Sequence, residues 1–168
     1  MRIALTALML ALAVSASFSV PKAQAQEYGV QNQTPATTGS CTFKKTEISA
    51  STSNLSTTST SFTNLGDGGS ISFTQKKTGC VAGTFFGNAG NTTANDNVHL
   101  QILIDGTACT PLTGGYVFAN SGLDLSSHSV AFFCGLVGGG SHTIQVQWAA
   151  GVGGEAEMFQ HSLEVNHS

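Results

Sequence analysis

The sequence predicts an all-β protein, an antiparallel β-sandwich with a jelly-roll-like arrangement of strands. Several segments alternate apolar and polar residues one by one, which is the period of a half-buried strand. Clusters of glycine, asparagine and aspartate separate these segments, as turns do. After residue 25, no segment of helical length repeats apolar residues at intervals of three and four. About eight to ten short strands are expected, a number typical of a sandwich or a jelly roll.

Residues 1–25 have the features of a secretory signal peptide. A basic start (Met1-Arg2) precedes an apolar run, and Ala23-Gln24-Ala25 forms an A-x-A cleavage site. A retained membrane anchor is the alternative, but Pro21 and the cleavage site favour removal after Ala25. Because no later run could span a membrane, we expect an exported protein, extracellular or periplasmic.

The remaining chain is predicted to hold a flexible polar tail at 26–40 and a single β-sandwich domain at 41–168. After cleavage it keeps four lysines, no arginine and all nine carboxylates, a formal charge of −5. That charge argues against nucleic acid as a partner. The lysine pairs at 44–45 and 76–77 are each expected to be solvated strand edges.

In the first half of the domain, 41–48 is expected to form a strand. The Ser- and Thr-rich stretch 50–63 is expected to be extended, because its β-branched threonines and spaced apolar residues suit a sandwich strand. Residues 66–69 and 76–79 have the composition of turns, and the alternating segment 70–74 lies between them as a clear strand.

The middle of the domain begins with an apolar strand at 80–86, in which three side chains should be largely buried: Val81, Phe85 and Phe86. Residues 87–97 are rich in asparagine and glycine and are expected to form a long polar loop. A strongly alternating strand follows at 98–104. Asp105-Gly106 then predicts a two-residue type I′ hairpin turn, which needs positive φ at both positions.

The last part contains a short strand at 116–118, a strand at 128–136 and the clearest strand, 140–148. Its inward face carries three apolar side chains: Ile144, Val146 and Trp148. We expect this strand to be central in the sandwich. A glycine-rich turn at 149–154 leads to a closing strand whose inward phase is expected to hold four residues: Phe159, His161, Leu163 and Val165.

Four cysteines follow the signal peptide, and an even number in an exported chain predicts two disulfides. Their spacing is too wide for C-x-x-C redox or zinc chemistry. Cys41–Cys80 and Cys109–Cys134 are the favoured pairs, because these cysteines lie at the ends of elements and the first bond would fix the N-terminal strand. Cys80–Cys134 is the alternative if those two strands are antiparallel neighbours.

Five runs of sequence carry a resemblance: Ser59–Phe62, Gly79–Val81, Asp105–Pro111, Phe132–Cys134 and Gly140–Trp148. With them, residues from about 41 to 166 resemble uncharacterised exported bacterial β-sandwich modules. The strand order is similar, more distantly, to C1q- and TNF-like jelly rolls. Neither resemblance implies a catalytic residue or a ligand. Those modules commonly carry an arginine shortly after the tryptophan strand, where this chain has Ala149-Ala150. The jelly-roll likeness and the low surface charge imply a small homo-oligomer.

Candidate chemical groups are few. Ser141 and His142 are neighbours on a strand and point to opposite faces, so we expect His142 to be a hydrogen-bonded residue at the end of a core strand. Glu155 and Glu157 are spaced like a glycosidase pair but lack surrounding aromatic residues, and are expected to be solvent-exposed. The loop Asn95-Asp96-Asn97 is oxygen-rich, so Ca²⁺ binding is an alternative to the solvated loop we expect.

These observations predict an exported module with a binding or structural role and not an enzyme, requiring no cofactor or metal. Its ligand would be an unknown protein or carbohydrate, and the loops at one end of the sandwich are where binding is expected. An extracellular hydrolase acting on glycans or esters through an unrecognised site is the alternative function.

Overall fold

A computed structural model describes residues 41–93, 96–111, 115–119, 125–152 and 154–168. The predicted signal peptide (1–25) and polar tail (26–40) lie outside these residues. The described residues fall within one compact unit, Ala36–Ser168. They contain no helix, and so none that is long and apolar enough to cross a membrane.

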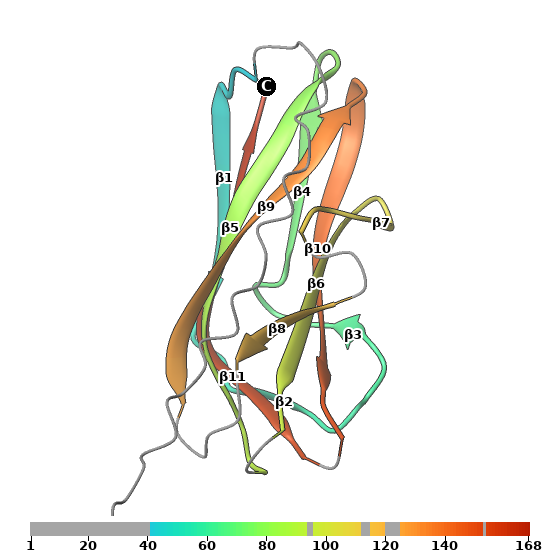
Figure 1. Ribbon diagram of the computed structural model, residues 1–168. Coiled ribbons are helices and arrows are strands. Elements are labelled where there is room, and N and C mark those ends of the chain that lie inside the picture. The colour runs from blue at the N-terminus through green and yellow to red at the C-terminus, as the bar shows by residue number, and fades with distance from the viewer. Residues whose placement is uncertain (1–40, 94–95, 112–114, 120–124, 153) are drawn as a thin grey trace, which may run out of the picture. The chain divides into compact units, whose positions relative to one another are not determined.

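Within these residues, eleven strands form two antiparallel sheets, which confirms the predicted all-β sandwich (Figure 1). The strands are β1 (Lys45–Ser51), β2 (Leu55–Thr57), β3 (Thr63–Asn64), β4 (Ser70–Gln75), β5 (Gly79–Asn91), β6 (Val98–Ile104), β7 (Thr107–Ala108), β8 (Tyr116–Ala119), β9 (Ser126–Val137), β10 (Gly140–Ala150) and β11 (Ala156–His167). One sheet has the order β1-β11-β5-β9, with β2 also paired to β11. The other has the order β3-β10-β6-β7, with β4 paired to β10 and β8 to β6.

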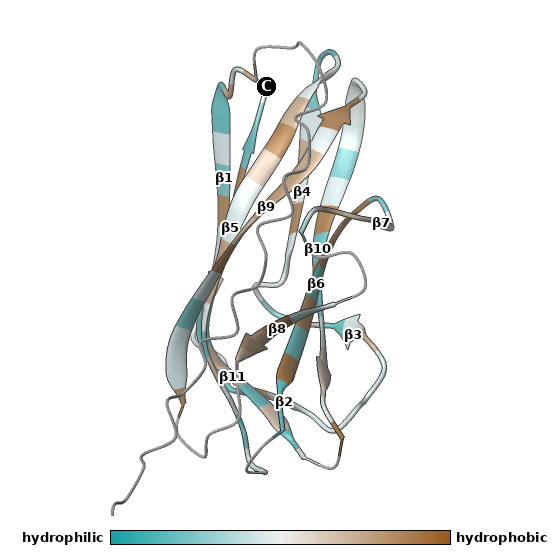
Figure 2. Cartoon of the chain, in the orientation of Figure 1, coloured by the Kyte–Doolittle hydropathy of each residue, from teal (hydrophilic) through white to brown (hydrophobic). Residues whose placement is uncertain are grey.

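The strand predicted to be central, β10, does lie between β6 on one side and β3 and β4 on the other. Ile144 and Val146 are fully buried, and Trp148 is almost so. The neighbouring β6 alternates buried and partly buried residues in the same way, and Figure 2 shows brown and teal bands along it. The core is filled from these inward faces, as the period of two predicted.

The Asp105-Gly106 turn is also confirmed. Asp105 has φ of 48° and Gly106 has φ of 83°, the pair of positive values that a type I′ turn needs. The turn joins β6 to β7, with Ile104 opposite Thr107. The return strand β7 contains only two residues.

The predicted loop at 87–97 is wrong for residues 87–91, which continue β5 to Asn91. β5 is paired along both edges, to β9 and to β11, so sheet hydrogen bonds override the loop-like composition. The glycine in this stretch is needed for packing, because a Cβ on Gly87 would lie 2.5 Å from Met158 Sδ. The burial predicted for Phe86 is wrong too: it is 37% exposed, since its neighbour Phe85 faces the core.

A β-bulge in β11 corrects the phase predicted for the last strand. The pairing with β5 shifts between Phe159 and Ser162, and Gln160 has φ of 38°. One extra residue at the bulge reverses which side chains face inward. Met158 is therefore fully buried where Phe159 was expected, while His161, Leu163 and Val165 are buried as predicted.

The Ser- and Thr-rich stretch is extended, but it does not form one strand. β1 and β2 pair with β11 in one sheet, and β3 pairs with β10 in the other. The stretch therefore crosses between the sheets. The first strand begins at Lys45 and not at Cys41.

Both favoured disulfides are present, Cys41–Cys80 and Cys109–Cys134. The alternative pair, Cys80–Cys134, required β5 and β9 to be antiparallel neighbours, and the structure does pair these two strands. However, Cys80 lies opposite Leu136, and a register shift on this pairing leaves Cys134 outside the ladder. Cys134 bonds instead to Cys109.

Candidate functional site

All four lysines of the described chain gather at one end of the sandwich. Lys44 and Lys45 lie at the start of β1, and Lys76 and Lys77 form the turn between β4 and β5. The end of β11 connects the two pairs: the Lys44 N–H donates to the His167 carbonyl at 2.9 Å, and β5 begins close to Ser168. In Figure 2 the start of β1 and the tip of the β4–β5 turn are both teal and lie near the same end. We call this region the lysine-lined end.

Two adjoining cavities open at the lysine-lined end. One has a volume of about 310 Å³ and the other about 360 Å³. Lys44, Lys77 and Ser168 line both of them. The remaining lining is mainly lysine and hydroxyl side chains, namely Lys45, Lys76, Thr42, Thr74 and Thr78, with Gly79, Cys80 and Leu136. Lysine and hydroxyl-bearing residues therefore lie together around both cavities.

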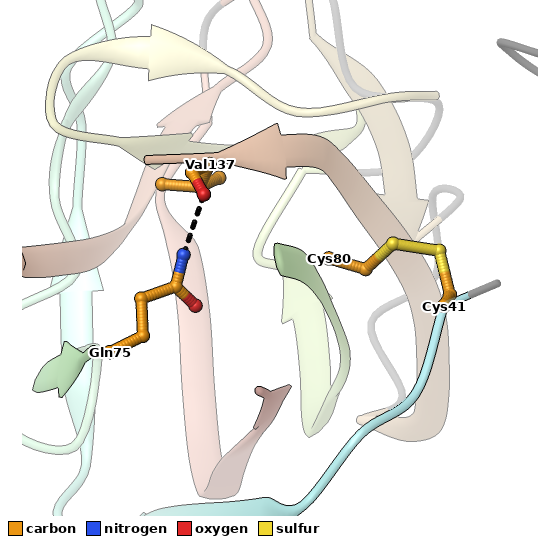
Figure 3. The surroundings of a disulfide bond; sticks show 4 residues. All are labelled: Cys41, Gln75, Cys80 and Val137. Atoms are coloured by element: carbon orange, nitrogen blue, oxygen red, sulfur yellow. Dashed lines mark hydrogen bonds between the residues drawn. A yellow bond between two sulfur atoms is a disulfide. The ribbon is translucent and has the colours of Figure 1, made fainter. Parts of the chain in front are cut away.

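Covalent and hydrogen-bonded contacts hold the lysine-bearing segments in place. The Cys41–Cys80 disulfide joins the chain just before β1 to the start of β5 (Figure 3). Gln75, at the end of β4, is 2% exposed, and its Nε2 donates to the carbonyls of Val137 and Gly138, both at 2.8 Å. These hydrogen bonds attach the end of β4 to the β9–β10 hairpin, and they hold in place the turn that carries Lys76 and Lys77.

No lysine at this end forms an ion pair with a carboxylate of the described residues. Among the residues that the structure describes, ion pairs form only between His142 and Asp105 and between His167 and Glu47. No lysine takes part in either. Four ammonium groups around two cavities, without carboxylate partners, favour an anionic ligand.

All four lysines are exposed, as expected for solvated strand edges, but their convergence on one end is not predicted from the sequence. One signal could have revealed it. Lys44 lies three residues after Cys41, and Lys77 lies three residues before Cys80. Because a disulfide holds its two Cα atoms within about 7 Å, the favoured pairing by itself brings the two lysine pairs together.

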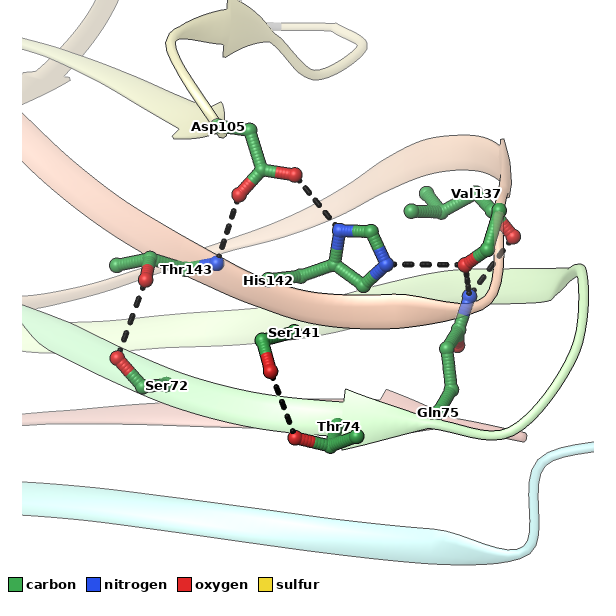
Figure 4. Close-up of polar contacts among 9 residues, drawn as sticks. Ser72, Thr74, Gln75, Asp105, Val137, Ser141, His142 and Thr143 are labelled. Atoms are coloured by element: carbon green, nitrogen blue, oxygen red, sulfur yellow. Dashed lines mark hydrogen bonds and ion pairs between the residues drawn. The ribbon is translucent and has the colours of Figure 1, made fainter.

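His142 has the hydrogen-bonded role predicted for it (Figure 4). Its Nδ1 lies 2.7 Å from Asp105 Oδ2, and its Nε2 lies 2.9 Å from the Gly138 carbonyl oxygen. The hydrogen bond from His142 holds the pKa of Asp105 below its usual value, and the Thr143 N–H on Asp105 Oδ1 adds to this effect.

This His–Asp pair lacks the arrangement of a hydrolase. A catalytic histidine needs one ring nitrogen free to take a proton from a nucleophile. Here Gly138 occupies Nε2, and the neighbouring Ser141 hydroxyl bonds to Thr74 Oγ1 at 3.2 Å on the other face. The geometry therefore explains His142 as a structural residue.

Two other candidates differ from expectation. Glu155 and Glu157 are partly buried and not solvent-exposed. Asn95 lies outside the described residues, and its neighbour Asp96 is only 7% exposed, so the expected solvated loop is wrong at Asp96. Within the described part of the chain, no group of three or more His, Cys, Asp or Glu residues could hold a metal ion.

No protein-family model matches the sequence, and a search of curated proteins finds no match. Among solved structures, the chain is similar to the CBM36-1 domain of a multidomain xylanase from the hindgut metagenome of Trinervitermes trinervoides. That similarity has 15% identity and a TM-score of 0.35, and covers 71% of this chain and 96% of that domain.

Two further solved structures are similar. In the structure of infectious bursal disease virus Gx strain, the values are 12% identity, a TM-score of 0.41, and coverage of 74% of this chain and 32% of that one. Dimeric latent PorU from Porphyromonas gingivalis has 9% identity and a TM-score of 0.44, and the match covers 79% of this chain and 14% of that one. The chain thus spans a minor part of these two proteins. At such values the similarities say nothing about ligand or activity.

Proposed function

We propose that this protein is an exported β-sandwich module that binds an anionic polysaccharide at the lysine-lined end. The observation that carries the proposal is the convergence of Lys44, Lys45, Lys76 and Lys77 on two shared cavities, with no carboxylate partner among the described residues. Carbohydrate was one of the two ligand classes expected from the sequence, and this charge narrows it to an acidic one.

The remaining lining suits sugars. Thr42, Thr74, Thr78 and Ser168 place hydroxyl groups beside the ammonium groups, and hydroxyls can both donate to and accept from sugar hydroxyls. Lysine binds carboxylate or sulfate as a point charge and tolerates varied geometry. A long nucleic acid is disfavoured, because the domain as a whole is acidic and its basic surface is confined to one end.

The wider proposal includes four features that the sequence predicts. They are cleavage after Ala25, export, membership of the exported bacterial β-sandwich modules, and assembly into a small homo-oligomer. Two disulfides in a domain with few charges support export, since disulfides persist in oxidising compartments. An oligomer would repeat the lysine-lined end and raise the avidity for a polymer. Light scattering at high concentration tests this point, and a monomer mass would contradict the oligomer.

Binding is tested by titrating the processed protein with polysaccharides matched in backbone but differing in charge. We expect calorimetric binding to polygalacturonate and heparin, weakening as salt rises from 50 to 500 mM, and none to the methyl-esterified or desulfated forms. Equal binding to charged and neutral forms, or no binding to either charged polymer, would overturn the proposal.

A further inference from the structure

We propose a calcium site at the end of the sandwich opposite the lysine-lined end, built on Asp96 and Asn91. Asn91 ends β5 and lies opposite Ala156, the first residue of β11. The lysines lie near the other end of β11. Because β11 has twelve residues, its ends are about 35 Å apart. The two sites are therefore separate, and one can exist without the other.

The starting observation is a buried carboxylate oxygen without a partner. Asp96 is 7% exposed; its Oδ1 accepts from the Asn97 N–H at 2.9 Å, while its Oδ2 makes no hydrogen bond. No ion pair to Asp96 occurs among the described residues. A buried carboxylate oxygen without a partner is unfavourable, so a cation bound at Oδ2 would compensate for its lost contact with water.

A second oxygen points into the same space. A Cβ built on Gly154 would collide with Asn91 Oδ1 and would lie 2.8 Å from Asp96 Oδ2. Both oxygens therefore lie within 2.8 Å of the position that a side chain at 154 would fill. Asn91 is 2% exposed, and its amide orientation is fixed: Oδ1 accepts from the Thr93 N–H at 2.9 Å, so it cannot donate to Asp96.

The surrounding loop leaves room for these oxygens. A Cβ on Gly151 would collide with Asp96 Oδ1, so glycine is required there by the carboxylate itself. The Gly151 N–H donates to the Asn97 carbonyl at 2.8 Å, and Thr92 bonds to the main chain of Glu155 in both directions. These bonds tie the β10–β11 loop to the segments that carry Asn91 and Asp96.

The side-chain donors of Asp96 and Asn91 indicate which cation would bind. It consists of one carboxylate and one amide oxygen, with neither histidine nor cysteine, and such hard oxygen donors suit Ca²⁺. Ca²⁺ accepts irregular shells that include amide oxygens and water, whereas Mg²⁺ demands near-ideal octahedral geometry. With two side-chain ligands, affinity is expected at the weak end for calcium modules, a Kd on the order of 10⁻⁴–10⁻³ M.

The test measures thermal unfolding of the processed protein in EDTA and after addition of 10 mM Ca²⁺, at constant ionic strength. We expect the Tm to rise by about 3–10 °C with Ca²⁺ and by less with Mg²⁺. In Asp96→Asn the shift should vanish. This variant should stay folded and match or exceed the parent Tm in EDTA, because its new amide can donate to Asn91 Oδ1.

Two further variants make the result specific. Asp67→Asn changes an exposed carboxylate elsewhere and should keep the full Ca²⁺ shift. Gly154→Ala places a methyl group against both oxygens and should lose the shift even if Asp96→Asn folds poorly. An absent Ca²⁺ shift in the parent, an equal shift with Mg²⁺, or a shift that survives in Asp96→Asn would each overturn the proposal. Binding at the lysine-lined end does not depend on any of these outcomes.

Discussion

Lys44 and Lys77 line the same two cavities, although they come from opposite sides of the Cys41–Cys80 disulfide. Each lysine lies three residues from its cysteine. The bond thus fixes the N-terminal segment to the start of β5 and holds two ammonium groups at one opening. The disulfide therefore both crosslinks the fold and positions residues of the candidate binding site.

Removing two ammonium groups should weaken binding to an acidic polysaccharide. In Lys44→Gln/Lys77→Gln we expect the Kd for polygalacturonate to rise about tenfold, because each exposed charge contributes up to about 1 kcal/mol. Lys44→Arg/Lys77→Arg keeps the charge and should keep most of the affinity. Titration calorimetry at 50 mM salt measures both, and an unchanged Kd in the glutamine variant would contradict the assignment.

The two disulfides should differ in their effect on binding. Replacing either pair by serine should lower the free energy of unfolding by about 3–4 kcal/mol, since each bond closes a loop of some tens of residues. Only Cys41→Ser/Cys80→Ser should also weaken polysaccharide binding, because that bond positions Lys44. Denaturant titration and calorimetry on both variants test this, and equal losses of affinity would count against it.

Acid should destabilise the protein below about pH 4. Hydrogen bonds from His142 to Asp105, and from Ser51 and then Ser53 to Asp67, hold both pKa values below the usual 3.8. A lowered folded-state pKa contributes stability above the unfolded value, and this contribution is lost as the pH falls through the folded-state pKa.

Asp105→Asn tests the contribution of the Asp105 carboxylate and its hydrogen bonds with His142 and Thr143. It should cost about 1 kcal/mol at pH 7 and show a smaller loss of stability between pH 5 and pH 2 than the parent. Glu164 is exposed and its side chain accepts a hydrogen bond from Asn166, so Glu164→Gln is the control and should behave as the parent. The urea midpoint of unfolding is measured for each protein across this pH range. If the midpoints of the parent and Asp105→Asn fell equally with pH, the role of Asp105 would be disproved.

The extension of β5 past residue 86 can be tested through one glycine. Gly87→Ala should destabilise the protein by about 1–3 kcal/mol, because the new Cβ would lie 2.5 Å from Met158 Sδ. Gly138→Ala meets nothing within 4 Å and is the matched control. If both variants had the same urea midpoint, residues 87–91 would not be packed as a strand.

We expect no hydrolytic turnover of ester, peptide or glycan substrates, because both ring nitrogens of His142 are occupied by Asp105 and Gly138. Assays with chromogenic substrates of each class, on the parent and on His142→Ala, measure this. Activity that is present in the parent and lost in His142→Ala would establish the alternative hydrolase function.

Local sequence pattern by itself determined the class of fold and several of its parts. The alternation through Ile144, Val146 and Trp148 set the inward face of β10, because a strand has a period of two wherever it lies. Asp105-Gly106 determined its own turn, since few residues tolerate positive φ at both positions. The cysteine positions indicated the pairing that the structure contains.

Tertiary structure decided what depends on partners distant in sequence. The composition of residues 87–91 predicts a loop, but pairing of 87–89 with β9 and of 88–91 with β11 makes them part of β5. Because of the bulge at Gln160, Met158 and not Phe159 is in the core, and no local sequence feature predicts this bulge. The gathering of the lysines and the burial of Asp96 arise because strand ends meet only when the sheets assemble. Charge and desolvation act between groups brought together in space, so these properties belong to the folded chain and not to any one segment of its sequence.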